Sequence, residues 1–214
     1  MNELDTLKGF IASQVREMVS LETQLTSVPA LAPESGGDGE LAKCEALALA
    51  LREMGFSSFE RYDAPDSRVP SGTRPNLVVT IPGKDPSRTL WFMTHLDVVP
   101  PGDQSKWNTD PWTVKEENGK IYGRGVEDNQ QGLVSSIFAA LAFLRTGIVP
   151  SHTVKLLFVA DEEVGSAYGI QYLLREHNLF RPQDIIVIPD GGDEQGATIE
   201  VAEKNLLWLK FSTK

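Results

Sequence analysis

Three short apolar runs, each ending in acidic residues or histidine, constrain this chain more than any other feature. They are TLWFMTHL (residues 89–96), TVKLLFVADEE (residues 153–163) and DIIVIPDGG (residues 184–192). Continuous apolar runs of this length are typical of strands that are covered on both faces. Helical patterns lie between them, at residues 131–144 and 167–177. This alternation of strands and helices predicts an α/β sandwich with a largely parallel central sheet.

The segments on either side of these runs extend the same pattern. Apolar residues at helical spacing predict two further helices, over residues 3–24 and about 39–54. Residues 56–62 and 75–83 have the composition of strands. The last segment, residues 197–214, resembles two more strands.

Side chains suited to metal binding follow each of the three apolar runs. In chain order they are His95, Asp97, Glu162, Glu163 and Asp190. Ligands of open α/β sheets bind just beyond the carboxyl ends of the strands, so these groups should meet at one edge. Imidazole and carboxylate groups suit zinc, and also cobalt or manganese. The sequence therefore predicts a divalent metal site at this edge of the sheet.

The spacing of these residues indicates different roles for them. His95 and Asp97 are two residues apart, so on an extended backbone they point to one side, and Asp97 can orient the His95 ring. Glu162 and Glu163 are adjacent, so their side chains diverge, and one can bind metal while the other acts as a general base. Asp128 lies in the Gly-rich turn GRGVEDNQQG, directly before a predicted helix, and can join the same site.

The charge balance and the single cysteine exclude several other kinds of protein and site. The chain has 214 residues with 30 acidic and 20 basic side chains, and this net charge of -10 argues against a nucleic-acid binder. Cys44 is the only cysteine, which excludes a disulfide within the chain and a Cys-based zinc site. Neither the apolar segment of a secretory signal nor a run of 18 apolar residues is visible. We therefore expect a cytoplasmic protein that does not span a membrane.

Five segments, taken in order, resemble the successive signatures of the M20 family of metallopeptidases and deacylases. They are THLDVVPPGD, W..DPW, GKIYGRGVEDNQQG, ADEEVGS and IPDGG, all within residues 70–214. The family includes acetylornithine deacetylases, succinyl-diaminopimelate desuccinylases, and di- and tripeptidases. The resemblance implies a zinc-peptidase-like (phosphorylase/hydrolase-like) three-layer sandwich and two zinc ions in a complete site. It also implies hydrolysis of an amide bond in a small N-acyl amino acid or a short peptide.

The resemblance implies a complete ligand set for the first metal. His95 corresponds to the histidine ligand, and Asp97 to the aspartate that orients its ring. Asp190 resembles the carboxylate that closes this set. Asp128 resembles the carboxylate shared by the two metals, and the family has a cis peptide after this residue, here Asp128–Asn129.

For the second metal the implied set is only partial. Glu163 resembles a ligand of this metal, together with the shared Asp128, and Glu162 resembles the general base. The family takes a further histidine from near the C-terminus, and neither His152 nor His177 has the required context. We therefore expect one well-held metal and one weak or empty position.

Two further features of the family bear on this chain. Members commonly carry a lysine two positions after the shared carboxylate, where this chain has Gln130. They also insert a lid domain, which makes the usual dimer contact and carries much of the substrate specificity. We expect residues 1–205 to be the N-terminal portion of the catalytic domain and residues 206–214 to be the start of the lid.

Three alternative functions remain open at this point. The chain could be an inactive metal-binding module that needs its C-terminal half. It could be a metal hydrolase of another class, such as a phosphoesterase, for which only Arg124 is obviously placed. It could also be a plain α/β binding protein without stoichiometric zinc. Locally, Asp128 could be a helix N-cap, and residues 161–163 a solvated run of charges.

Overall fold

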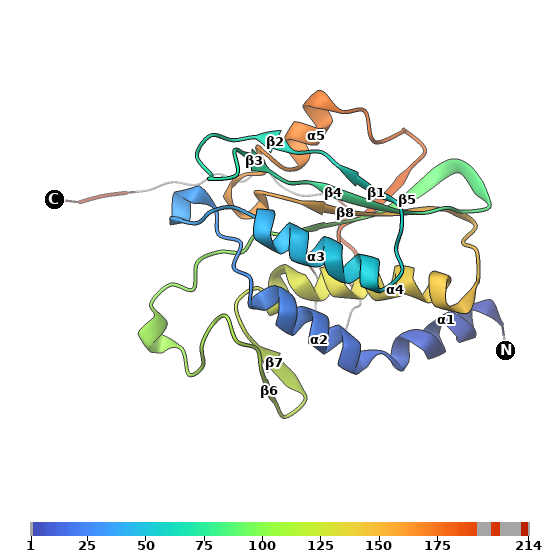
Figure 1. Cartoon of the computed structure of the whole chain (residues 1–214), viewed down its shortest axis with the longest axis horizontal. Coiled ribbons are helices and arrows are strands. Elements are labelled where there is room, and N and C mark those ends of the chain that lie inside the picture. The colour runs from blue at the N-terminus through green and yellow to red at the C-terminus, as the bar shows by residue number, and fades with distance from the viewer. Residues whose placement is uncertain (1, 192–197, 202–210, 214) are drawn as a thin grey trace.

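A five-stranded sheet with the strand order β1-β4-β8-β5-β9 lies at the centre of the molecule (Figure 1). The strands are β1 (Phe59–Arg61), β4 (Leu77–Ile81), β5 (Asp85–His95), β8 (His152–Val159) and β9 (Ile185–Val187). β5 pairs in parallel with both β8 and β9, whereas β4 pairs antiparallel with β8 and with β1. Within this sheet only β4 is reversed, and the other four strands share one direction. The predicted α/β class with a mostly parallel sheet is therefore confirmed.

This computed structural model describes residues 2–191, 198–201 and 211–213. The strands expected within residues 197–214 and the boundary expected after residue 205 fall mostly outside these ranges, so both stay predictions.

Helices cover both faces of the sheet. They are α1 (Glu3–Ala12), α2 (Val15–Thr26), α3 (Leu41–Glu53), α4 (Gly132–Thr146) and α5 (Ile170–Glu176). Figure 1 shows α2, α3 and α4 below the sheet and α5 above it, which gives the three layers that the resemblance implied. Four short helical turns complete the helical structure of the described residues: η1 (Pro33–Ser35), η2 (Gln104–Lys106), η3 (Val126–Gln131) and η4 (Glu162–Val164). The hairpins are β2 (Ala64–Pro65) with β3 (Thr73–Arg74), and β6 (Lys115–Glu117) with β7 (Lys120–Tyr122).

Strand β8 shows why its sequence is apolar at nearly every position. Successive side chains of a strand point to opposite faces of the sheet. Leu156 and Phe158 accordingly belong to the large core between the sheet and helices α2, α3 and α4. Leu157 and Val159 belong to a smaller core with Leu173 of α5. Both faces of the strand are buried, as the continuous apolar run predicts.

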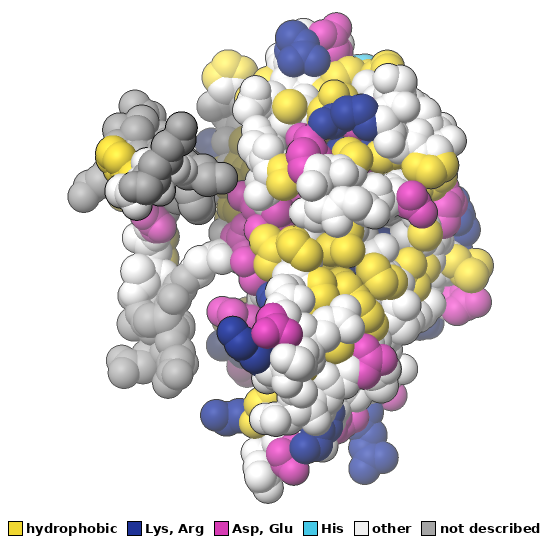
Figure 2. Space-filling view, turned by 90° about the vertical axis from the view of Figure 1, so that its left-hand side faces the viewer, with side chains coloured by type: hydrophobic (Ala, Val, Ile, Leu, Met, Phe, Trp, Pro, Cys, Tyr) yellow, Lys and Arg dark blue, Asp and Glu magenta, His cyan; other side chains and the backbone are white. Residues whose placement is uncertain are grey.

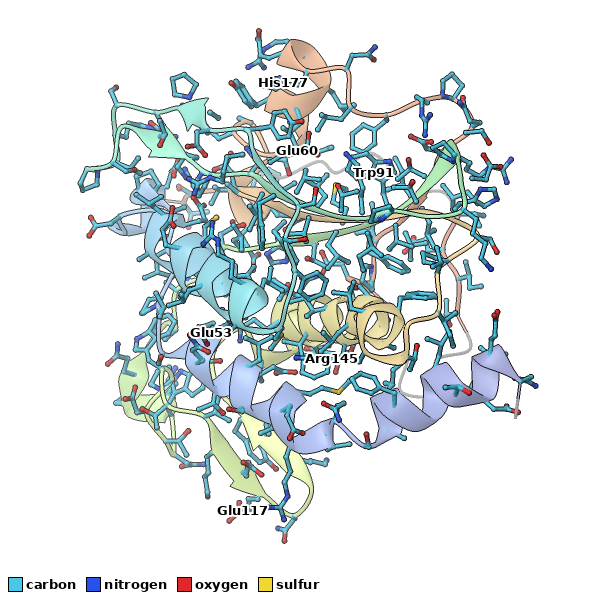
Figure 3. All side chains as sticks on the ribbon, turned by 45° about the vertical axis from the view of Figure 1, so that its right-hand side comes forward. Glu53, Glu60, Trp91, Glu117, Arg145 and His177 are labelled. Atoms are coloured by element: carbon cyan, nitrogen blue, oxygen red, sulfur yellow. The ribbon has the colours of Figure 1, made fainter. Side chains whose placement is uncertain are left out.

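The second core continues toward the rim of the sheet on the α5 side. Trp91 of β5 belongs to this core, and its ring lies edge-on to Phe180 with 4.9 Å between the ring centroids. His177, at the end of α5, packs against the rings of Tyr62 and Tyr172. Figure 3 shows Trp91 and His177 on this side of the sheet and Arg145 of α4 on the other.

The prediction of one helix over residues 3–24 is wrong in one respect, because the structure has two helices there. The first ends at Ala12 and the second begins at Val15. Between them, the Ser13 hydroxyl donates to the Phe10 carbonyl at 2.6 Å, and the Ser13 N–H also donates to this carbonyl. Serine side chains compete in this way for backbone groups and interrupt helices. The apolar spacing continues across the break, so it could not reveal it.

The parallel strands bring distant segments together at one edge. Because β5, β8 and β9 run in the same direction, the residues that follow them lie at the same end of the sheet. This end is at the left in Figure 1, and Figure 2 views the molecule from that side. None of the described helices is long and apolar enough to cross a membrane.

Glu22 of α2 gives a test of the packing below the sheet. Its side chain is buried, one carboxylate oxygen has no hydrogen-bond partner among the described residues, and burial raises its pKa to about 7. The folded state therefore holds a proton that the unfolded state releases near its ordinary pKa of 4.5. We expect stability from this group below about pH 4.5 and its loss as the pH rises through about 7.

The variant Glu22→Gln should remove this pH dependence. At pH 8 its free energy of unfolding should exceed that of the parent by up to about 3 kcal/mol, and at pH 4.5 the two should agree. Urea unfolding at both pH values measures the difference. Glu17→Gln, on the exposed side of the same helix, is the control. Equal differences at the two pH values would contradict the prediction.

Candidate metal centre

His95 is the last residue of β5, and its ring is held in one orientation. The ring is buried, and Nδ1 lies 2.9 Å from the main-chain carbonyl oxygen of Asp97. A carbonyl can only accept, so Nδ1 carries a hydrogen and donates it. The other ring nitrogen, Nε2, then points at the carboxylates of the site. This is the arrangement in which a histidine binds a metal through Nε2.

The carboxylates predicted for the site surround His95 Nε2. The nearest oxygen of Asp128 lies 3.0 Å from this nitrogen, and the nearest oxygen of Asp190 lies 3.6 Å from it. In the part of the chain that the structure describes, two groups of three residues have ligand atoms within 4.8 Å of one another: His95 with Glu162 and Asp190, and His95 with Asp128 and Glu163. The structure therefore brings together every residue that the sequence placed in the site.

Asp97 makes contacts that its sequence spacing did not reveal. Its buried carboxylate lies 3.6 Å from His95 Nδ1, a distance compatible with the orienting role expected for it. The same carboxylate accepts hydrogen bonds from the backbone N–H groups of Glu162 and Glu163, both at 3.0 Å. Asp97 thus joins the end of β5 to η4, which carries the two glutamates. Residues 162 and 163 are consequently held by their backbone and are not a free run of charges.

A buried ion pair between Arg74 and Glu40 lies next to Asp161, the residue before η4. Asp161, the residue before η4, has a left-handed backbone (φ 68°), which Asp tolerates better than most residues. Arg74 forms a two-pronged ion pair with Glu40, and its guanidinium also lies 3.2 Å from the Asp161 carboxylate. The Asp161 N–H donates to Glu40 at 3.3 Å. These fully buried partners tie the end of β8 to the start of α3, and the sequence had no signal for them.

Two glycines permit close backbone approaches beside the site. A Cβ atom on Gly132 would lie 2.1 Å from the Pro189 carbonyl oxygen, and one on Gly169 would lie 2.0 Å from the Ala160 carbonyl oxygen. Gly132 therefore lets the segment before Asp190 lie against the start of α4. Gly169 does the same for the end of β8 and α5. A glycine without positive φ gives no local signal of such a contact, so these two were missed.

The turn that carries Asp128 also joins the site through Asn129. The peptide Asp128–Asn129 is cis, as the resemblance implied, and the Asn129 side chain accepts from the His95 N–H at 3.4 Å. The Asp128 side chain is 60% exposed and faces His95. It does not cap α4, because the residue at the N-cap of α4 is Gln131. The N-cap alternative for Asp128 is thus wrong.

The electrostatics of the site are those of crowded negative charge. Burial and the neighbouring Asp128 raise the pKa of Glu163 to about 7. Burial alone would lower the pKa of the His95 ring, but Asp190 and Asp97 outweigh it and raise the pKa to about 10. The interaction with His95 in turn lowers the pKa of Asp190. A proton on His95 therefore partly balances the carboxylates when no other cation is present.

The donor set fits a divalent metal. Glu163 lies in the cluster around His95, and one of its carboxylate oxygens is buried without a hydrogen-bond partner among the described residues. A buried polar atom of this kind is costly unless it is paired. A bound cation would pair it and would relieve the repulsion that raises the pKa of Glu163. One imidazole nitrogen with several carboxylates is also a ligand set that zinc, cobalt or manganese accepts.

Two basic residues have positions that bear on the sequence predictions. Gln130 occupies the place of the lysine common in the M20 pattern, and its Oε1 lies 3.3 Å from the Nζ of Lys43 on α3. A cation is therefore present at this point, although another part of the chain provides it. Arg124 lies over the Trp107 ring, 5.3 Å from its centroid.

Comparison with known proteins gives the family. Residues 91–204 match the model of peptidase family M20/M25/M40. This chain is a member of that family. The match covers the ends of β5, β8 and β9 and thus all the residues gathered around His95. An assignment to the M20 family from the five sequence segments is therefore confirmed.

Curated relatives of this M20 protein include metallohydrolases and desuccinylases. An uncharacterised metallohydrolase of Methanocaldococcus jannaschii is 39% identical over 94% of the chain and 50% of its own length. A succinyl-diaminopimelate desuccinylase of Delftia acidovorans is 38% identical over 92% of the chain and 50% of its own length. The chain thus spans about half the length of the curated relatives it matches.

Solved structures of the same fold include several peptidases. A dipeptidase of Saccharomyces cerevisiae superposes with a TM-score of 0.73 at 25% identity, over 88% of this chain and 41% of its own. Human carnosine dipeptidase 1 superposes with a TM-score of 0.71 at 24% identity, over 89% of this chain and 42% of its own. The second likeness shows the fold alone.

Asp97→Asn tests how the M20 site is held together. The amide keeps one acceptor oxygen but turns an N–H donor toward a backbone N–H, which should cost about 1–3 kcal/mol of stability. It also removes a charge that raises the pKa of His95, so this pKa should fall below about 10. Urea unfolding and an NMR titration of the His95 ring measure the two effects.

Asp184→Asn is the matched control for this variant. Asp184 is also buried and accepts from two backbone N–H groups, of Thr89 and Arg181, but it lies outside the cluster around His95. It should lose stability without a change in the His95 pKa. An unchanged His95 pKa in Asp97→Asn would contradict the electrostatic part of the prediction.

Proposed function

We propose that this protein hydrolyses an amide bond in a small N-acyl amino acid or a short peptide with the help of a divalent metal. The observation that carries the proposal is the cluster of four carboxylates around one buried histidine, whose Nε2 atom faces them. Membership of the M20 family supports a hydrolase. The names of the relatives, a desuccinylase and a dipeptidase, support an acyl-amino acid or peptide substrate.

We assign one complete ligand set and part of another to this chain. His95, Asp128 and Asp190 would hold one metal, and Glu163 with the shared Asp128 would hold a second less firmly. Zinc is the metal we propose, and cobalt or manganese would suit the same donors. A metal held there would polarise the substrate carbonyl and stabilise the negative charge that develops on its oxygen.

Glu162 is the general base in this proposal. Its backbone is fixed by the Asp97 carboxylate, and its side chain lies near both His95 and Asp190. It is more exposed than Glu163, so it can reach both water and a substrate. Its carboxylate would take a proton from the attacking water and pass it to the leaving amine.

A metal titration tests the two positions separately. We expect this chain to bind one zinc ion tightly and a second weakly or not at all, as measured by competition with a chromophoric chelator. Binding should tighten as the pH rises toward about 10, because the metal displaces the proton that His95 otherwise holds. Two equally tight sites would refute the assignment of ligands.

Glu162→Gln separates catalysis from metal binding. The amide cannot accept a proton, so hydrolysis of N-acyl amino acids and dipeptides should fall by about 100-fold or more while tight zinc binding persists. His95→Ala should lose both properties. Glu117→Gln, on the exposed β6–β7 hairpin, is the control. If the unaltered chain binds zinc but shows no turnover, the alternative of an inactive metal-binding module is favoured.

A further inference from the structure

Lys43 is a buried cation that the proposed reaction does not use. It lies on α3 with 1% of its surface exposed, and its Nζ donates to Oε1 of Gln130 at 3.3 Å. This neutral amide is its hydrogen-bond partner among the described residues. Nε2 of Gln130 in turn donates to the Thr26 hydroxyl at 2.7 Å. Lys43, Gln130 and Thr26 thus link α3, η3 and α2 in one buried chain of hydrogen bonds.

Burial makes the charged form of the Lys43 ammonium group unfavourable in this position. Burial lowers the pKa of Lys43 to about 8, and the negative charges of Asp97 and Glu40 oppose this shift. A methionine of similar shape would fill the same space without the cost of desolvation. Packing alone therefore does not account for a lysine here.

Gln130 connects this cation to a metal ligand. It is two residues after Asp128 in η3, it is itself buried, and its N–H donates to the Gly125 carbonyl at 3.0 Å. Its side chain reaches both α2 and α3 through hydrogen bonds. Asp128, by contrast, is mostly exposed, and its carboxylate reaches His95 Nε2 at 3.0 Å only if the turn that carries it keeps its path.

We propose that Lys43 is a positioning residue of the metal site: it fixes the Gln130 side chain and thereby holds the turn that presents Asp128 to His95. The proposal rests on the proposed function, since it assigns Lys43 to the same metal site. The role is that of a group that acts through another residue, because the Lys43 ammonium does not touch the ligands around His95.

Metal affinity and local backbone exchange test this role in the whole chain. Lys43→Met removes the ammonium and keeps an apolar side chain. Lys43→Gln combined with Gln130→Lys exchanges the two partners and keeps both the charge and the hydrogen bond. Leu51→Ala is the matched control, because Leu51 is fully buried on the same helix and packs in the core away from the site. Zinc affinity, thermal unfolding and hydrogen–deuterium exchange of residues 125–131 are measured for each.

We expect Lys43→Met to weaken zinc binding by about 10- to 100-fold, the range for residues that orient metal ligands. It should also speed exchange in residues 125–131 of the metal-free chain. The exchanged pair should restore both to near the parent values. Leu51→Ala should lower the melting temperature without either effect.

Two results would overturn the role of Lys43. One is a zinc affinity in Lys43→Met equal to that of the parent, and the other is an exchanged pair no better than Lys43→Met. If the parent chain itself binds no zinc, the proposed function fails, and hydrogen exchange still decides on Lys43. Unchanged exchange in residues 125–131 would then show that Lys43 does not hold this turn.

Discussion

The Asp97 carboxylate is the contact on which the geometry of the site depends. It is buried beside the His95 ring and accepts hydrogen bonds from the backbone N–H groups of both Glu162 and Glu163. This side chain therefore links the end of β5 to the turn after β8. Hydrogen bonds to an ionised acceptor are stronger than those between neutral groups, and an unpaired buried charge would be costly. The contact is thus both rigid and difficult to replace.

Around this contact the molecule gathers more negative than positive charge. The carboxylates near His95 raise the pKa of its ring, and their mutual repulsion helps to raise that of Glu163. Two buried cations, Arg74 and Lys43, lie on the inner side of this region and contact Glu40 and Gln130. Because both cations are buried against these partners, they do not pair with the carboxylates around His95. A divalent cation, which the M20 family implies, would balance this excess of carboxylates.

Much of this site could be predicted because its residues follow strands. His95 and Asp190 come directly after apolar runs, and parallel strands place their carboxyl ends at one edge. The partners that hold the site come from elsewhere. Arg74 lies in a two-residue strand, Lys43 within a helix whose sequence is mostly apolar, and Gly132 at a point without unusual φ. Each acts through a contact with a residue distant in sequence, and no local pattern records such a contact.

The sequence by itself determined the class of the fold, the end of the sheet at which the site lies and the types of group that compose it. Hydrophobic periodicity and the chemistry of imidazole and carboxylate groups are local properties, so a single chain displays them. The tertiary structure decided the rest. It set the break between α1 and α2 and the antiparallel direction of β4. It also brought the Asp97 carboxylate to the backbone of Glu162 and the Lys43 ammonium of α3 to Gln130. These features depend on which surfaces pack together once the chain has folded. The energy of a charge buried between such surfaces depends on the groups around it, which the local sequence does not specify.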